Sequence, residues 1–309
     1  MTSYTNFIGI DIGKCSFFIS IHQSNLTQEY ENSITGINKF IEEFDDILLN
    51  SLCVAENTGG YELEFIYSLI AHGYKVHRAD ARKVKNFIRS FGFAAKTDKL
   101  DAKALALYGY ERADRLKLFE AQSTETIELQ QLLHRRHDLK SSLVAEKNRL
   151  QAPSTNFIRD SIIELINTIN DQLESIDNKI RFLIANNSIL KKKNAILKTI
   201  PGIGEVVAFE LLILLPELGS LSRRAIASLA GVAPKANDSG KFSGYRRTGH
   251  GRRGIKPILF LAAMAARNSK TYLKKFYEKL IVKGKKKMVA LTALMRKILV
   301  IANARLKEI

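Results

Sequence analysis

Apolar and polar positions in the first third of the chain alternate between strand-like and helix-like spacing. Residues 5–35 contain three short apolar runs rich in β-branched residues and bounded by turn formers, which predicts three strands in an antiparallel meander. Helical spacing follows in residues 37–48 and 61–73, and two further strands are predicted at 51–57 and 74–80. This alternation of strands and helices is typical of a mixed α/β sheet.

The middle of the chain is helical almost throughout. A helix is predicted from about Asp98 to Asp114, and residues 123–190 keep helical spacing with a break near Pro153. This spacing indicates an antiparallel helical hairpin or coiled-coil stalk, carried by Ile127, Leu132, Leu139, Leu143, Ile162, Leu165, Ile169, Leu173 and Ile176. The alternative is two helices packed into one globular core. We predict a first domain at 1–117, a helical connector at 118–193 and a second domain at 194–309.

The last third is predicted to be mainly helical, with two exceptional segments. LKTIPGIGEVVAFELLILL places a glycine-containing turn between two helical runs, which resembles a helix-hairpin-helix DNA-binding turn. Gly202 and Gly204 would let the backbone come close to a phosphate. A plain helix–helix turn is the alternative. Residues 235–256 are rich in Gly, Ser and basic residues and are predicted to form a loop.

Composition and charge narrow the partners of the protein. The 309 residues include 48 Lys and Arg against 31 Asp and Glu, a net charge of +17, which favours a polyanion such as nucleic acid. We find no run of about 18 apolar residues and no signal peptide, so no membrane partner and a cytoplasmic location are expected. Cys15 and Cys53 form no CxxC pair, and both are expected to be buried apolar residues.

Basic residues are concentrated in two places near the C-terminus. The 235–256 segment contains a single acid, Asp238, and the KGKKK segment follows later in the chain. These cations could grip backbone phosphates or form solvated surface. The candidates for nucleic-acid binding are Lys241, Arg246, Arg247, Arg252, Arg253, Lys285, Lys286 and Lys287.

Four carboxylates could hold divalent metal. Asp11 ends the first predicted strand and Glu56 ends the fourth, so a parallel pairing would put the two side by side, which is costly without cations. Asp98 and Asp101 lie three residues apart on one face at a helix start. Taken singly, Asp11 fits a turn residue, and Asp98 and Asp101 fit an N-cap and an acidic third position. Together the four form a ligand set for two Mg²⁺ ions.

Several motifs resemble one family of mobile-element enzymes over nearly the whole chain. FIGIDIGK, AENTGGY and KTDKLDAKALA resemble the RuvC-like DEDD domain of the Piv/MooV-type insertion-sequence transposases. IPGIGEVVA, ASLAGVAP and NDSGKFSG resemble the C-terminal transposase domain of that family. The resemblance implies an RNase H/RuvC-like mixed sheet in residues 1–117, with Asp11, Glu56, Asp98 and Asp101 as ligands of Mg²⁺ or Mn²⁺.

The same resemblance implies a serine nucleophile, Ser239, which would cleave a DNA strand through a transient phosphoserine link. Ser243 is the rival assignment, and nearby arginines could stabilise the developing charge. A structured guide RNA and a homo-oligomer, dimer or tetramer, are also implied. Two other classes compete with a transposase: a RuvC-type nuclease that uses water on the same carboxylates, and a non-catalytic nucleic-acid-binding scaffold.

Overall fold

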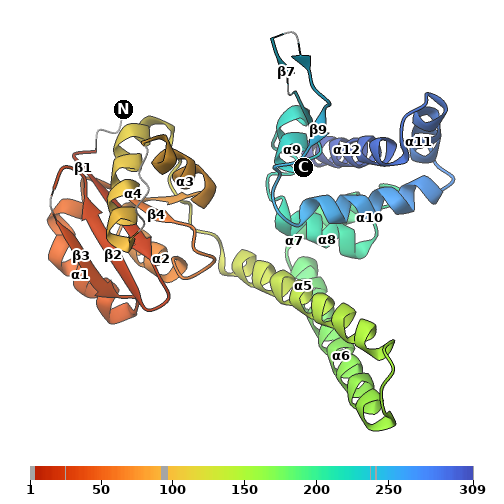
Figure 1. Ribbon diagram of the computed structural model, residues 1–309, viewed down its shortest axis with the longest axis horizontal. Helices are drawn as coiled ribbons and strands as arrows, with labels where there is room; N and C mark the ends of the chain where they lie inside the picture. The colour runs from red at the N-terminus through yellow and green to blue at the C-terminus, as the bar shows by residue number, and fades with distance from the viewer. Residues whose placement is uncertain (1–3, 25, 92–96, 237, 241, 309) are drawn as a thin grey trace. The chain divides into compact units, whose positions relative to one another are not determined.

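The computed structural model divides into two compact units, Met1–Gln122 and Ser123–Ile309, which are described separately (Figure 1). It describes residues 4–24, 26–91, 97–236, 238–240 and 242–308. The helical hairpin belongs to the same compact unit as the C-terminal helices. The predicted boundary between a connector at 118–193 and a second domain at 194–309 therefore stays a prediction.

The first unit is built on a five-stranded mixed sheet with the order β3-β2-β1-β4-β5. The meander is confirmed, since β2 pairs antiparallel with both β1 and β3, and β4 runs parallel to β1 and β5. The strands are β1 (Asn6–Ile12), β2 (Ser16–Ile21), β3 (Thr27–Glu31), β4 (Ser51–Glu56) and β5 (Lys75–Ala79). Cys53 is buried in β4 as expected. Cys15 is exposed because it lies in the connection between β1 and β2, so that part of the expectation is wrong.

Helices cover both faces of this sheet (Figure 1). One face packs its even-numbered β1 residues, such as Ile8 and Ile10, against aromatic side chains of the helices α1 and α2. The other face packs Phe7 against residues of α3 and α4. The predicted strands, α1, α2 and α4 are confirmed, whereas α3 was not predicted from the sequence. The helices are α1 (Ile34–Leu48), α2 (Leu63–Ala71), α3 (Ala81–Ser90) and α4 (Asp98–Arg112), followed by a 3-10 turn, Ala113–Arg115.

The second unit begins with the expected helical hairpin, formed by α5 (Thr124–Leu150) and α6 (Asn156–Asn186). Two apolar clusters hold the helices antiparallel. Toward the connection between the two helices, Leu139 and Leu143 of α5 pack only on residues of the hairpin itself. Near its base, Leu129 and Ile180 also contact Phe209 of α8, so the base of the hairpin shares a core with the C-terminal helices.

The remaining helices form the largest apolar core of the molecule. Where the sequence predicted one loop at 235–256, the structure has two small antiparallel ladders, β6 with β9 and β7 with β8. In the described part of the chain, no helix is both long enough and apolar enough to span a bilayer. The bounds are α7 (Ser188–Lys198), α8 (Glu205–Leu214), α9 (Arg223–Leu229), β6 (Pro234–Lys235), β7 (Asp238–Ser239), β8 (Phe242–Ser243), β9 (Arg247–Thr248), α10 (Ile255–Asn268), α11 (Tyr272–Val282), α12 (Lys287–Arg305) and a 3-10 turn, Leu306–Glu308.

Candidate functional site

Strand alternation places two of the predicted carboxylates on one face of the sheet. Successive side chains of a strand point to opposite faces, and Phe7 of β1 and Val54 of β4 both belong to the core on the α4 side. Asp11 and Glu56 follow these residues at even spacing, so both belong to the same side. The parallel register pairs Ile10 with Ala55, one residue before each carboxylate. Asp11 and Glu56 therefore sit at the same end of adjacent strands.

A glycine in β1 brings α4 close to this face of the sheet. A Cβ built on Gly9 would lie 2.0 Å from the carbonyl oxygen of Ala102 and 2.2 Å from the backbone nitrogen of Ala106. Only a residue without a side chain allows the helix backbone to approach β1 this closely. Gly9 lies two residues before Asp11 on the same face, so this contact fixes the distance between Asp11 and the start of α4.

The start of α4 presents two aspartates that do not cap the helix. Thr97 is the N-cap, and its hydroxyl oxygen accepts a hydrogen bond of 3.3 Å from the backbone N–H of Leu100. The alternative that Asp98 is the N-cap and Asp101 the third helical residue is therefore wrong by one position. A threonine already fills the capping role, and Asp98 and Asp101 stand in the first turn. Their negative charges are favoured there by the helix dipole.

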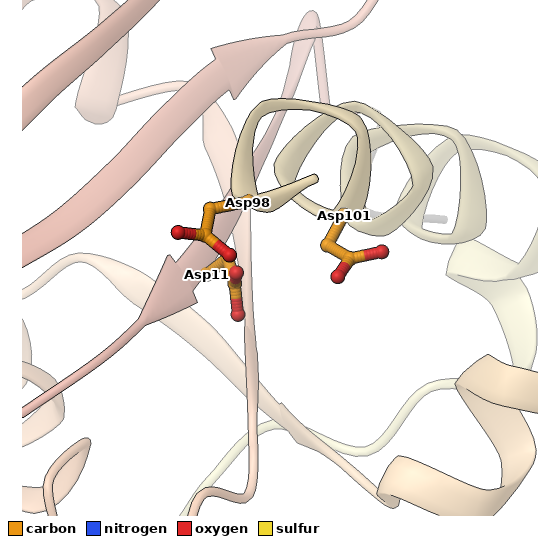
Figure 2. A group of neighbouring side chains, drawn as sticks. All are labelled: Asp11, Asp98 and Asp101. Atoms are coloured by element: carbon orange, nitrogen blue, oxygen red, sulfur yellow. The ribbon is translucent and has the colours of Figure 1, made fainter. Parts of the chain in front are cut away.

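Three carboxylates from distant parts of the sequence converge at this point (Figure 2). Ligand oxygens of Asp11, Asp98 and Asp101 all lie within 4.8 Å of one another. Asp11 and Asp101 are half-buried and Asp98 is exposed. Glu56 is not a member of this close group, although its strand position places it at the same sheet edge. A cluster of hard oxygen donors that brings like charges together is the chemistry that Mg²⁺ or Mn²⁺ binding requires.

A buried ion pair holds the loop that follows Glu56. Glu62 is fully buried, and one of its oxygens accepts bonds from the Thr58 hydroxyl at 2.9 Å and the Gly60 N–H at 2.8 Å. The other oxygen accepts a bond of 2.9 Å from Nε of Arg78, whose guanidinium also reaches the Asn57 side chain at 3.2 Å. Burial alone would raise the pKa of Glu62, but these hydrogen bonds outweigh it and lower that pKa.

Glu62 and Arg78 were not singled out from the sequence. A lone Glu in a Gly-rich turn and an Arg in a strand give no pattern that links them across 16 residues. The strand of Arg78, KVHRA, also contains Lys75 and His77, so the sequence does not mark this Arg as the partner of a buried carboxylate. The pair fixes Asn57, the residue next to Glu56, and so helps to define where β4 ends.

The predicted serine lies on the β7–β8 ladder in the second unit. Ser239 pairs with Phe242, and Asp238 pairs with Ser243, across a turn that begins at Gly240, whose φ is +53°. Ser239 is exposed, and its hydroxyl makes no hydrogen bond with the residues that the structure describes. The hydroxyl of Ser243 donates a bond of 3.4 Å to Asp238. Both serines are accessible, so the geometry leaves the choice of nucleophile to experiment.

Two of the predicted arginines, Arg252 and Arg246, form ion pairs with acidic residues of the second unit. Arg252 donates to the carbonyl of Leu214 at 2.7 Å and to Glu217 at 2.8 Å, which gives it a structural role. Burial would raise the pKa of Glu217, yet the bond from Arg252 lowers it. Arg246 pairs with Asp238 at 2.8 Å, beside Ser239.

The other predicted cations are exposed wherever the structure describes them. Arg247 lies in β9 and Arg253 follows the ladders. Lys285 and Lys286 lie in the connection between α11 and α12, and Lys287 begins α12. Lys241 lies outside the described residues.

The predicted phosphate-binding glycines have different surroundings. A Cβ on Gly202 would lie 2.3 Å from the carbonyl oxygen of Ala262 in α10, and the φ of Gly202 is +90°. Helix packing and backbone geometry therefore account for Gly202, as the helix–helix turn alternative holds. Gly204 is exposed, is the N-cap of α8, and has open space around its Cβ position. Of the two, Gly204 is the glycine that an incoming phosphate could reach.

Two family models match the chain. One, described as a transposase and named for DEDD transposases of the IS110 type, matches residues 8–153. The other, described as the transposase IS116/IS110/IS902 family, matches residues 194–278. The chain is also similar to the pilin gene-inverting proteins of Moraxella lacunata and Moraxella bovis. Identity to each is 29% over 312 residues, covering 98% of this chain and 96% of the relative. The residues matched by the first family model include the carboxylate cluster, and those matched by the second include the ladder with Ser239.

Proposed function

We propose that this chain is a DNA-recombining transposase of the IS110 type, the type named by both matching family models, and that Ser239 and a metal-bound carboxylate site together cut and rejoin DNA. The observation that carries the proposal is the convergence of Asp11, Asp98 and Asp101 within 4.8 Å at one sheet edge. The Moraxella relatives are named for inverting a pilin gene. Inversion requires strands to be cut and rejoined, and we extend this class of reaction to the present chain.

Asp11, Asp98 and Asp101 would hold Mg²⁺ or Mn²⁺, with Glu56 as the fourth ligand of a DEDD set on an RNase H/RuvC-like sheet. The support for Glu56 is its position at the end of β4, beside Asp11 in parallel register. When bound, divalent metal supplies charge stabilisation to the oxygens around a reacting phosphate. The Gly9 contact and the Thr97 cap keep α4 where its two carboxylates face Asp11.

The serine would make the reaction a transfer rather than a hydrolysis. The Oγ of Ser239 forms a bond to phosphorus, while the bond from phosphorus to a sugar oxygen of the same strand breaks. The serine proton leaves Oγ, and the departing sugar oxygen gains a proton. A hydroxyl of another strand end reverses the step, so the phosphodiester count is unchanged and no high-energy cofactor is consumed. Arg246, which pairs with Asp238 beside Ser239, would stabilise the developing negative charge.

A structured guide RNA and a homo-oligomer complete the proposal. Both follow from the resemblance to insertion-sequence transposases, and the net charge of +17 favours a nucleic-acid partner. Gly204, Arg247, Arg253 and the lysines Lys285 to Lys287 would contact phosphate, since these groups are exposed on the second unit.

Strand exchange on the ends of the element, with Mg²⁺ and co-purified nucleic acid, tests this function. Ser239→Ala and Asp98→Asn should each abolish exchange, while Ser243→Ala, a change of the same size four residues along, should retain it. Loss of exchange in Ser243→Ala but not in Ser239→Ala would move the nucleophile. Cleavage without joining, unaffected by either serine change, would identify a water-using nuclease and overturn the proposal.

A further inference from the structure

The second unit contains a groove of about 970 Å³ at the base of the strands that carry Ser239. Its walls come from the helices α9, α11 and α12, from the strand β6, and from the Tyr245–Thr248 segment, which ends in β9. A volume of this size is in the range of sites that enclose a ligand. The groove does not belong to the carboxylate site, which lies in the first unit.

The floor of the groove is apolar and exposed. Tyr245 is 68% exposed and Met288 is 60% exposed, and Phe276 and Val300 continue the lining. Large apolar side chains gathered in an open groove are uncommon on a soluble protein unless they meet a partner. An exposed aromatic ring beside other apolar groups provides a surface on which an unstacked base can lie.

The charges along the groove select an anionic occupant. Its described lining residues include five Arg and Lys side chains and no Asp or Glu. Lys297 lies 4.2 Å from the centroid of the Phe276 ring, where a cation–π contact holds it. Arg223, Arg247 and Arg296 take part in no ion pair among the residues that the structure describes. Cations that are not neutralised within the protein attract phosphate.

Ser239 and part of the groove lining lie a few residues apart along the chain. The chain passes from Ser239 through the β8 strand directly into Tyr245 and Arg247 of the groove wall. Arg246, also in that wall, pairs at 2.8 Å with Asp238, the neighbour of Ser239. A strand whose phosphate reaches Ser239 would therefore meet the groove with its adjoining nucleotides.

We infer that this groove binds single-stranded DNA next to the phosphate that is cut. Unstacked bases lie against Tyr245 and the apolar floor, and Arg223, Arg247 and Arg296 bind the phosphates. The inference rests on the proposed role of Ser239 for its choice of DNA as the source of the strand. Duplex DNA does not fit this description, because its bases are stacked inside the helix and cannot reach an apolar floor.

Equilibrium binding without chemistry tests the groove separately from the reaction. Fluorescence anisotropy of the full chain carrying Ser239→Ala, in EDTA, measures affinity for a labelled mixed-sequence single strand, its duplex and the matching RNA. Tyr245→Ala should weaken single-strand DNA binding about 10-fold, because stacking of one base is worth roughly 1–3 kcal/mol, and Tyr245→Phe should restore it. Tyr272→Ala, an exposed tyrosine of the same unit outside the groove, should have little effect.

Two neighbouring arginines on α9 provide a matched charge control. Arg223 lines the groove, whereas Arg224, also exposed, does not. Arg223→Ala should weaken single-strand binding and lower the salt slope by about 0.7, the value for one phosphate contact on a single strand, while Arg224→Ala should leave the slope nearly unchanged.

In a photo-crosslinking experiment, a single-stranded oligonucleotide that contains 5-iodouracil should become attached to the peptide that contains Tyr245. Equal losses for Arg223→Ala and Arg224→Ala, with crosslinks only elsewhere, would overturn the inference. A loss confined to RNA would assign the groove to RNA instead, and a change in oligomeric state without any change in oligonucleotide binding would assign it to a protein interface. Failure of Ser239 as a nucleophile would leave these binding results unchanged, so the two ideas fail separately.

Discussion

Replacing Gly9 by alanine should damage the proposed metal site without changing any of its proposed ligands. The added Cβ would lie 2.0 Å from the Ala102 carbonyl oxygen, where ordinary contact is 3.4–4 Å. The clash is with helix backbone rather than with a flexible side chain, so α4 must retreat from β1 by about 1 Å or more. Overpacking of this kind costs about 1–3 kcal/mol of unfolding free energy. Because α4 carries Asp98 and Asp101, the same movement separates them from Asp11.

The affinity for metal should fall more than stability alone would explain. Mg²⁺ requires ligand oxygens at about 2.0–2.1 Å in near-octahedral geometry, so a displacement of about 1 Å removes ligands from the site. Loss of supporting contacts around metal sites commonly weakens binding by about 10- to 100-fold. We expect Gly9→Ala to weaken Mn²⁺ binding, measured by isothermal titration calorimetry on the full chain, by an amount in this range.

Gly249→Ala is the matched control, since a Cβ at Gly249 meets nothing within 4 Å and its backbone is not in the left-handed region. Urea unfolding should show a loss of stability for Gly9→Ala and almost none for Gly249→Ala. Equal unfolding free energies and equal Mn²⁺ affinities for the two variants would refute the argument that the Gly9 contact positions α4.

Two further predictions concern charge. Affinity for nucleic acid should fall steeply as the salt concentration rises, because Lys and Arg side chains that bind phosphate release counterions. A nearly flat plot of log affinity against log salt concentration would contradict this electrostatic interpretation. The lowered pKa of Glu62 means that its contribution to stability is present above its ordinary pKa of 4.5 and is lost as the pH falls through the lower folded value. Glu62→Gln should therefore lower the midpoint of urea unfolding at pH 7 and lessen its dependence on pH below 4.5, and an unchanged acid-side profile would contradict the role given to the Arg78 pair.

The sheet and its helices were predictable because local pattern and tertiary burial agree there. The apolar run Leu52 to Ala55 in β4 corresponds to a strand buried on both faces, and the apolar residues of β1 correspond to the strand that joins the meander to β4. The helical hairpin was predictable for the same reason, since seven of the nine apolar residues predicted to join its helices belong to the two clusters between α5 and α6. Ile127 belongs to neither cluster, and Leu165 is exposed. The α3 helix was missed because it is a mainly polar helix whose N-cap, Asp80, was assigned to the end of a strand.

The carboxylate site was predictable in part. A strand-end Asp and two aspartates at a helix start can be read from the sequence, but their convergence depends on how closely α4 packs on β1. That distance is set by Gly9. A glycine inside a strand pattern indicates a close backbone approach, but the sequence does not identify which segment approaches it. The Asp98 cap assignment failed because Thr97, one residue earlier, competes for the same role and wins with a hydroxyl.

The groove and the engagement of Arg252 were not accessible to sequence reasoning. Arg246, Arg252 and Arg253 appear equivalent in a basic run, yet one pairs with Asp238, another with Glu217, and their partners lie up to 35 residues away. Likewise, Tyr245, Phe276 and Val300 come together in one groove only after the chain has folded. Long-range pairing of this kind leaves no periodicity along the chain.

The central claim is that a serine of the second unit, and not water, attacks the DNA strand. The most direct test is to incubate the protein with a labelled DNA carrying the element end, denature it, digest the protein and locate any nucleotide-linked peptide by mass spectrometry. We expect a phosphodiester link on Ser239 that disappears in Ser239→Ala and in Asp11→Ala. Cleaved DNA with no covalently attached peptide, or a link that persists in Ser239→Ala, would contradict it.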